Sequence, residues 1–241
     1  MSNISRRKLI AATAGASGLA VAARLAGQYG LIPPDHGGIY GAGTTLTYAS
    51  QRLLTHQSLA REFPRSEISK APFAKLRPFK QETFERLRDG GFVDWRVEVG
   101  GMVARPTSFS MTDLRSLPSR TQVTQLACEE GWSFIAEWTG VPLSHVLKAA
   151  GTPPQARYVV YYSLQPRWWE SIDMTDALHP QTLLVYGMNG ADLPMRHGGP
   201  LRMSVPRQLG YKSVKFISRL IVTDSLERFK KGSSYSWYAG I

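Results

Sequence analysis

The sequence predicts an α+β fold with mixed or antiparallel sheets and short helices. Strand-like segments follow one another through the second half of the chain, and few helical stretches lie between them. The steady strand–helix alternation of a doubly wound parallel sheet does not occur in the sequence. With 241 residues, 43% of them hydrophobic and 20% charged, the chain is long enough to bury one core.

The first elements lead to the single cysteine of the chain. Apolar and polar residues alternate over residues 93–99, which predicts a strand. Residues 110–113 have the spacing of a capping box, which predicts the start of a short helix. A further strand is predicted over residues 121–127, directly before Cys128. These elements place Cys128 where a strand ends.

The second half of the chain contains one more predicted helix and several strands. Pro142 suits the first turn of a helix that Gly151 closes. Asn189 and Gly190 form a dipeptide typical of a two-residue hairpin turn. Further strands are predicted over residues 157–164, 183–188, 201–205 and 214–223.

The N-terminus has the features of an export signal. Arg6 and Arg7 precede an apolar run rich in Ala and Gly, which is typical of a twin-arginine signal over residues 1–27. The alternatives are an anchor helix, a general secretory signal and an unexported helix. We expect a periplasmic protein, either free or held at the membrane by this segment or by a partner.

The remainder is predicted to form an arm and one domain. Residues 28–45 are rich in Gly and Pro, which indicates an irregular arm. Residues 46–241 are predicted to form a single catalytic domain. Within it, residues 46–63 have loose helical spacing, and the polar residues 64–91 are expected to wrap the surface.

Composition excludes some classes of function. The formal net charge is +11, and the four cations of the first 27 residues leave about +7 for the rest. These positive residues are scattered, whereas nucleic-acid binding favours basic runs beside stacking aromatic residues. No glycine-rich dinucleotide fingerprint follows a predicted strand, which disfavours nicotinamide or flavin binding.

Cys128 is the residue with the most chemical interest. It could be a small buried hydrophobe, a nucleophilic thiolate or a metal ligand. Glu129 and Glu130 follow it, and two acids oppose thiolate formation, whereas coordination of a metal deprotonates a thiol outright. One cysteine cannot build a zinc or iron–sulfur site alone. It can supply the single protein ligand of a metal that an organic cofactor also holds.

Two sequence blocks resemble the sulfite oxidase fold family. The first is Leu126-Ala127-Cys128-Glu129-Glu130-Gly131-Trp132-Ser133 with Trp138-Thr139-Gly140-Val141-Pro142-Leu143. The second is His197-Gly198-Gly199-Pro200-Leu201-Arg202, followed by Gly210-Tyr211-Lys212-Ser213-Val214-Lys215. Within the family the chain is most similar to the bacterial branch that contains the periplasmic protein-methionine-sulfoxide reductase. The resemblance implies a sulfite-oxidase-type molybdopterin-binding fold and a molybdenum–molybdopterin cofactor.

The resemblance also implies particular site residues. Cys128 falls on the catalytic position that binds the metal. Arg202 and Lys215 suit the pterin phosphate, because guanidinium and ammonium groups bind phosphate oxygens well. The full set of cofactor-binding residues that it implies is Ser58, Arg61, Glu62, Cys128, Ser163, His197, Arg202, Ser213, Val214 and Lys215.

The chain also departs from the family pattern. The acids after Cys128 replace the basic surroundings of a sulfite site, which favours a sulfoxide-like substrate, small or protein-bound. The stretch 165–171 is short beside the reductase branch, so the substrate is not fixed by the resemblance. The sequence contains no haem-attachment motif. We therefore expect a separate haem-bearing membrane subunit to exchange electrons with this one.

Several interpretations stay open at this point. The leading hypothesis is an oxidoreductase that transfers an oxygen atom at molybdenum. The chain could instead be a cofactor-free binding or scaffold protein of the same fold, or a cysteine hydrolase that pairs Cys128 with His197. Trp168 and Trp169 could line the substrate entrance, dock a partner or pack in the core. The histidines without metal-ligand spacing are His36, His56, His145 and His179.

Overall fold

The structure is a computed structural model that describes residues 26, 30–37, 39, 41–75, 81–229, 236–238 and 240–241. The predicted export signal therefore lies almost wholly outside the described residues. The chain divides into two units, Met1–Thr55 and His56–Ile241, and each is described by itself. Among the described residues, no helix combines the length and the apolar character that crossing a membrane requires.

The first unit contains helix α2, Gly41–Leu54. The sequence predicted a helical segment over residues 46–63, so both of its boundaries were wrong. The start lies within the Gly- and Pro-rich stretch that was expected to be irregular. The end comes early because residues 60–63 of the second unit are extended: the Gln181 side chain bonds both backbone groups of Ala60, and Phe63 N donates to Val123 O.

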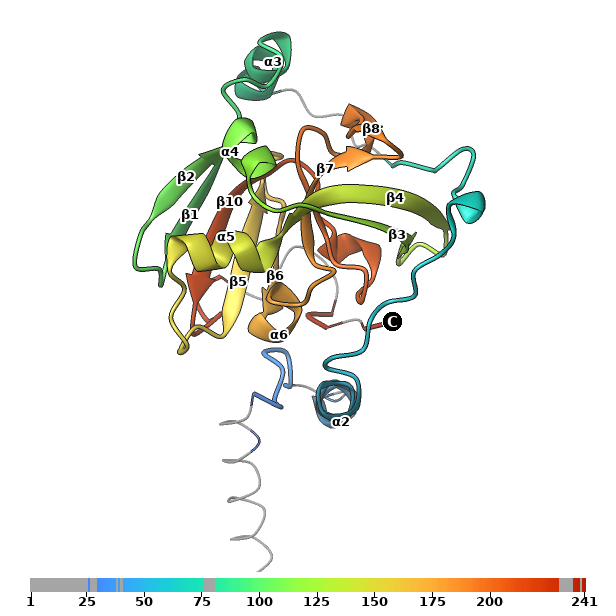
Figure 1. Ribbon diagram of the computed structural model, residues 1–241. Helices are drawn as coiled ribbons and strands as arrows, with labels where there is room; N and C mark the ends of the chain where they lie inside the picture. Colours follow the sequence, from blue (N-terminus) through green and yellow to red (C-terminus); the bar gives the residue numbers. More distant parts are fainter. Residues whose placement is uncertain are drawn as a thin grey trace, which may run out of the picture. The chain divides into compact units, whose positions relative to one another are not determined.

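The second unit contains two five-stranded sheets (Figure 1). The first has the order β2-β1-β10-β5-β6, in which β1 and β10 are parallel and the other neighbours antiparallel. Its strands are β1 Arg96–Gly101, β2 Thr107–Ser110, β5 Tyr158–Ser163, β6 Trp169–Asp173 and β10 Ile217–Thr223. The predicted mixed α+β class is thereby confirmed.

The second sheet carries the strand that leads to Cys128. Its order is β3-β4-β7-β8, and β9 also pairs with β7, with all pairs antiparallel. Its strands are β3 Arg120–Ala127, β4 Ser133–Pro142, β7 Leu183–Met188, β8 Ala191–Asp192 and β9 Arg202–Ser204. Asn189 and Gly190 join β7 to β8 with positive φ at both residues, so the hairpin prediction is confirmed.

Short helices connect the strands. The α-helices are α3 Glu82–Asp89, α4 Met111–Ser116, α5 Leu143–Ala150 and α6 Met174–Ala177. The 3-10 helices are η1 Arg65–Glu67, η2 Met195–His197 and η3 Gly210–Lys212. The predicted capping box is present, because the Ser110 hydroxyl accepts from Asp113 N and the Asp113 carboxylate accepts from Ser110 N. Gly151 ends α5, as predicted, and adopts the left-handed conformation, whereas Pro142 precedes the first turn as the N-cap and ends β4.

Some elements differ from the predictions. The first strand begins at Arg96 instead of residue 93, because residues 91–94 form turns with positive φ at Phe92. Helix α3 lies within the polar segment that was expected only to wrap the surface. Its one buried residue, Phe84, packs against the rings of Trp95 and Phe216, which explains why polar composition concealed it.

The main core lies between the two sheets and helix α5. Val97, Val159 and Leu220 from the first sheet, and Val141 and Leu184 from the second, are completely buried in one cluster. This packing fixes the two sheets against each other. Loops that leave the ends of both sheets can therefore hold side chains in a defined arrangement.

Candidate functional site

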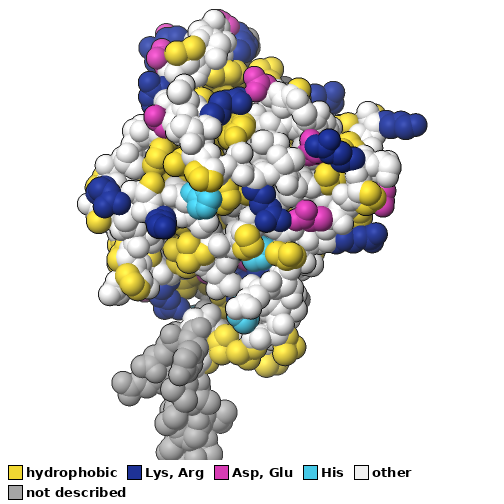
Figure 2. All heavy atoms as spheres, in the orientation of Figure 1, with side chains coloured by type: hydrophobic (Ala, Val, Ile, Leu, Met, Phe, Trp, Pro, Cys, Tyr) yellow, Lys and Arg dark blue, Asp and Glu magenta, His cyan; other side chains and the backbone are white. Residues whose placement is uncertain are grey.

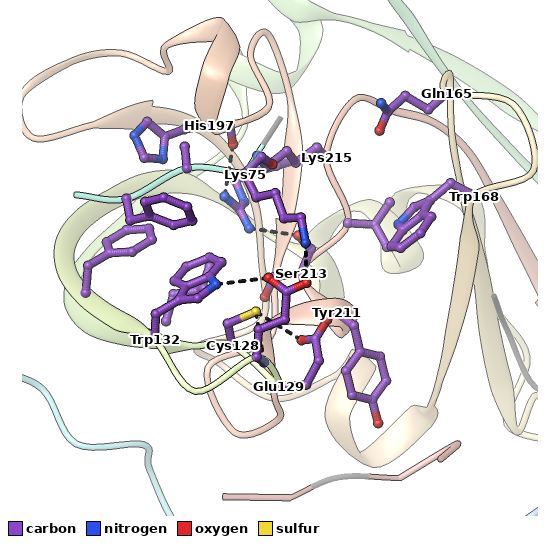
Figure 3. Close-up of a pocket in the computed structure, with 18 of the residues that line it drawn as sticks. Lys75, Cys128, Glu129, Trp132, Gln165, Trp168, His197, Tyr211, Ser213 and Lys215 are labelled. Atoms are coloured by element: carbon purple, nitrogen blue, oxygen red, sulfur yellow. Dashed lines mark hydrogen bonds and ion pairs between the residues drawn. The ribbon is translucent and has the colours of Figure 1, made fainter. Parts of the chain in front are cut away.

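A cavity of about 330 Å³ lies where loops from both sheets meet. Figure 3 shows Cys128, Glu129 and Trp132 on one side and Gln165 and Trp168 on the other. The lining residues are Phe73, Ala74, Lys75, Leu126, Cys128, Glu129, Glu130, Trp132, Phe134, Gln165, Pro166, Trp168, His197, Arg202, Gly210, Tyr211, Ser213, Val214 and Lys215.

Cys128 sits in a tight turn between β3 and β4. Its N–H donates to Trp132 O at 2.8 Å, and Gly131 N donates to its carbonyl at 3.1 Å. Gly131 closes this turn with a φ of +90°, a conformation that favours glycine. Gly210 crosses close by, and a Cβ at that position would lie 3.1 Å from the Leu126 side chain. The backbone thus fixes Cys128 at the cavity wall.

The surroundings of Cys128 hold its thiol in the protonated form. Burial and the neighbouring Glu129 and Glu130 carboxylates raise the pKa of the thiol to about 11, although the Glu130 N–H favours the thiolate. Its sulfur lies 3.4 Å from Glu129 Oε2, and no hydrogen bond joins it to His197. A cysteine hydrolase needs a base beside the thiol, so this arrangement does not support one. A metal would remove the proton.

Arg202 forms the buried basic wall of the cavity. Its guanidinium donates to the carbonyl oxygens of Met203, His197 and Ser213, and it lies over the Trp138 ring at 5.1 Å. These bonds use three of the five N–H donors of a guanidinium. Burial lowers the pKa of Arg202 to about 10.

Lys215 lies beside Arg202 on the same wall. Its Nζ donates to Lys75 O at 2.9 Å and to Arg196 O at 2.8 Å, which leaves one N–H of the ammonium for a ligand. Burial and then the charges of Arg202 and Arg196 lower its pKa to about 7. Gly198 allows this packing, because a Cβ there would lie 2.7 Å from Lys215 Cγ.

His197 completes the basic wall as a neutral imidazole. Burial and the charges of Arg202, Lys215 and Arg196 lower its pKa to about 4. Its ring packs edge-on against Phe134 at 5.6 Å. A neutral imidazole can donate one hydrogen bond without adding to the crowded positive charge.

Aromatic side chains form the rest of the mouth of the cavity. Trp132 stacks on Phe134 with ring centroids 6.2 Å apart and receives the edge of Phe73 at 4.8 Å. The two adjacent tryptophans diverge: Trp168 lines the cavity, whereas Trp169 stacks on Tyr162 and donates to Phe229 O. Only Trp168 therefore has the position expected of an entrance residue.

The structure brings together six of the ten residues proposed as cofactor-binding. Cys128, His197, Arg202, Ser213, Val214 and Lys215 line the cavity. The other four do not line it. Glu62 lies at the edge of β3, where it pairs with Thr124 and accepts from Arg120 and Gln181, whereas the Ser58 backbone bonds His179. The Arg61 guanidinium covers the Phe63 ring.

Ser163 has an indirect position. Its hydroxyl accepts from Gln165 N at 2.9 Å, so it supports the loop that carries the cavity residues Gln165 and Trp168. Phe73 and Lys75 are cavity residues that the sequence did not indicate. They lie far from Cys128 in sequence and within no recognisable pattern, so only tertiary structure reveals them.

The donor set fits a metal that reaches the protein on an anionic organic group. Among the described residues, no carboxylate pairs with Arg202 or Lys215, although both carry spare donors on a largely buried wall. Buried positive charge without a counter-charge is costly unless an anion binds there. The Cys128 thiol lines the same cavity, and coordination of a metal would deprotonate it to a thiolate ligand.

Comparisons with known proteins agree with this donor set. The family of the oxidoreductase molybdopterin-binding domain matches residues 87–229. A protein of Azospira oryzae, provisionally named the protein-methionine-sulfoxide reductase subunit YedZ1, is 35% identical over 78% of this chain and 70% of its own length. The protein-methionine-sulfoxide reductase catalytic subunit MsrP of Xanthomonas axonopodis is 38% identical over 51% of this chain and 43% of its own.

A solved structure shares the fold. The sulfane dehydrogenase SoxCD from Paracoccus pantotrophus matches with a TM-score of 0.53 and 26% identity, over 55% of this chain and 39% of that one. The chain thus spans less than half the length of the MsrP and SoxCD chains that it matches.

The site and these matches define a class of protein, the molybdopterin-dependent oxidoreductases of sulfite-oxidase-type fold. The chain belongs to the family of the oxidoreductase molybdopterin-binding domain, and it is an enzyme whose cofactor is molybdenum–molybdopterin.

Proposed function

We propose that this chain is the catalytic subunit of an exported enzyme that reduces sulfoxides, including methionine sulfoxide in proteins, by oxygen-atom transfer. The observation that carries the proposal is the presence of Cys128 and the Arg202–Lys215 wall on one cavity. The relatives named as methionine-sulfoxide reductase subunits support the substrate class. None of these cavity residues favours the alternative of a cofactor-free binding or scaffold protein.

Different residues of the cavity would bind the metal, the pterin phosphate and the substrate. When bound, the cofactor supplies a molybdenum centre at which two-electron oxygen-atom transfer takes place. Cys128 Sγ would hold the metal, while Arg202 and Lys215 would hold the phosphate of the pterin. Trp132 and Trp168 on opposite sides of the mouth restrict water and offer aromatic surface to the apolar alkyl groups of a sulfoxide substrate.

The charges around Cys128 favour a neutral substrate over sulfite. The Glu129 carboxylate lies beside the sulfur, so an oxyanion that approaches Cys128 meets negative charge. A sulfoxide is uncharged and avoids this repulsion. Its reduction consumes two electrons and two protons and releases a thioether and water, so a separate donor must supply the electrons.

We also propose the periplasm as the location and a haem-bearing membrane subunit as the electron donor. Arg6 and Arg7 before an apolar run support export by the twin-arginine route, which carries folded proteins.

The surface charge does not favour nucleic acid as a partner. On the face shown in Figure 2, Lys and Arg side chains are interspersed with Asp and Glu side chains and do not form one continuous basic patch, which nucleic-acid binding favours.

The proposal is tested with protein purified from an exporting host. The wild type should contain molybdenum and pterin, and with an artificial electron donor it should reduce methionine sulfoxide in preference to oxidising sulfite. The Cys128→Ser variant should lose at least about 100-fold in sulfoxide reduction, because even groups that only support a metal ligand are worth about 10–100-fold. Sulfite oxidation faster than sulfoxide reduction would contradict the substrate class.

A further inference from the structure

A short segment before α3 contributes to the wall of the cofactor cavity. We call residues 71–75 the strap. Before it, Ser69 is fixed to β4, because Ser69 N donates to Ile135 O and Ile135 N donates to Ser69 Oγ. Beyond it the chain leaves the described residues. Phe73, Ala74 and Lys75 of the strap line the cavity.

The strap contacts both functional ends of the cavity. The Lys75 ammonium forms an ion pair with the Glu130 carboxylate, in the turn that carries Cys128. The Lys75 carbonyl accepts from Lys215 Nζ at 2.9 Å, on the basic wall. Figure 3 shows Lys75 beside Lys215 in the cavity, near the turn that carries Cys128.

The contact with Glu130 extends into the aromatic wall. The second carboxylate oxygen of Glu130 accepts from Trp132 Nε1 at 3.2 Å, and the Trp132 ring packs against Phe73 of the strap. Two contacts therefore join the strap to the cysteine turn. One is the ion pair between Lys75 and Glu130, and the other is the ring contact between Phe73 and Trp132.

We propose that Lys75 is a positioning residue that closes the strap over the bound cofactor and slows its release. This inference rests on the cofactor assignment and goes beyond it, because Lys75 acts through Glu130 and Lys215. The Lys215 ammonium has three donors: two hold Lys75 O and Arg196 O, and the third is available to an anion. Occupation of the basic wall and closure of the strap therefore involve the same ammonium group.

The exposure of the Lys75–Glu130 pair indicates that it affects the rate of cofactor release more than the free energy of unfolding. The side chains of Lys75 and Glu130 are 48% and 35% exposed, and such pairs add little to the stability of a fold. Opening the strap requires this pair, the Phe73–Trp132 contact and the hydrogen bond from Lys215 Nζ to Lys75 O to separate, while both sheets stay intact. Cofactor exit should therefore be sensitive to Lys75 although unfolding is not.

The test uses the cofactor-loaded enzyme and measures the rate at which molybdenum and pterin leave it during dialysis. Lys75→Met keeps the length of the side chain but removes its charge, so we expect release about 3-fold faster. Lys75→Arg should restore a rate near that of the wild type, because its guanidinium can still hold Glu130. Lys70→Met, at an exposed lysine that precedes the strap, is the matched control and should release the cofactor at the wild-type rate.

A double-mutant cycle with Glu130→Gln isolates the ion pair. The combined Lys75→Met and Glu130→Gln variant should release the cofactor no faster than Lys75→Met alone. Equal release from Lys75→Met and the wild type would overturn the proposal. So would a fall in the Tm of cofactor-free Lys75→Met, because that would indicate a general structural role. A wild type that binds no molybdenum would overturn the cofactor assignment and this proposal together.

Discussion

At the scale of single residues, the site combines groups that are unfavourable until a ligand arrives. The Cys128 thiol is kept protonated by burial and by two acids, while Arg202 and Lys215 face each other's positive charge across the basic wall. The free-energy cost of keeping a charge in this wall is clearest at Lys215, because burial and its basic neighbours lower its pKa to about 7. An anionic cofactor that carries a metal would neutralise the positive charges of Arg202 and Lys215 and would take the proton's place on Cys128.

The pKa of Lys215 predicts how the stability of the cofactor-free protein changes with pH. Between about 7 and the ordinary value of 10.5, the unfolded chain binds a proton on this lysine that the folded chain has released. The contribution of Lys215 to the free energy of unfolding therefore rises with pH across this window. Urea unfolding of cofactor-free protein at several pH values between 7 and 10 measures it.

Lys215→Met provides the comparison. The variant should lose this part of the pH dependence and should have a Tm a few degrees above that of the cofactor-free wild type near pH 7. It should also carry less cofactor, because a phosphate-binding charge is gone. A variant that is less stable than the wild type without cofactor would show that the lysine is not under electrostatic strain.

At the scale of elements, close contact between strands holds the cysteine turn in place. Strand β4 pairs with β3 on one side and with β7 on the other, and its register with β7 shifts between Thr139 and Gly140. Gly140 permits this shift, because a Cβ there would lie 2.3 Å from Leu184 O. The β4 strand that follows the cysteine turn therefore depends on one glycine.

This predicts a large effect of Gly140→Ala. The added methyl group would collide with backbone that cannot move without breaking the sheet, so we expect a loss of about 1–3 kcal/mol in the free energy of unfolding. Gly100→Ala in β1 is the matched control, since its Cβ would meet only the Ile221 side chain at 3.8 Å. Chemical denaturation of both variants checks the difference, and equal stability would contradict the contact.

Elements with local signals could be predicted from the sequence, and elements without them could not. The Ser110–Asp113 capping box and the Asn189-Gly190 turn depend on residues adjacent in the chain, and both are present. Helix α3 buries one residue, Phe84, so its apolar period was too weak to recognise. Phe73 and Lys75 reach the site only because tertiary structure brings residues 71–75 over a turn that lies far along the chain.

At the scale of the whole molecule, a buried ion pair ties the basic wall to the first sheet. Lys212 in η3 donates to Glu170 Oε2 in β6 at 2.9 Å, and neither side chain is more than 2% exposed. Lys212 also donates to Ser171 O, and the Trp237 ring lies near its ammonium. Ser213 and Lys215 follow shortly after Lys212 in sequence, so this pair anchors the segment that we propose binds the pterin phosphate.

Removing one partner of this pair should therefore destabilise the protein. Lys212→Met leaves the Glu170 carboxylate buried without its lysine, and we expect a loss of about 3–5 kcal/mol. The double variant Lys212→Met with Glu170→Leu should recover part of that loss, because the buried carboxylate is removed together with its lysine. A double variant as unstable as the single one would contradict the role of the charge and indicate packing instead.

The proposed function depends most directly on a bond between Cys128 and molybdenum. X-ray absorption at the molybdenum edge measures the sulfur atoms around the metal directly. We predict that Cys128→Ser, loaded with cofactor, loses one sulfur neighbour relative to the wild type. An unchanged number of sulfur neighbours in a fully loaded variant would show that Cys128 does not bind the metal.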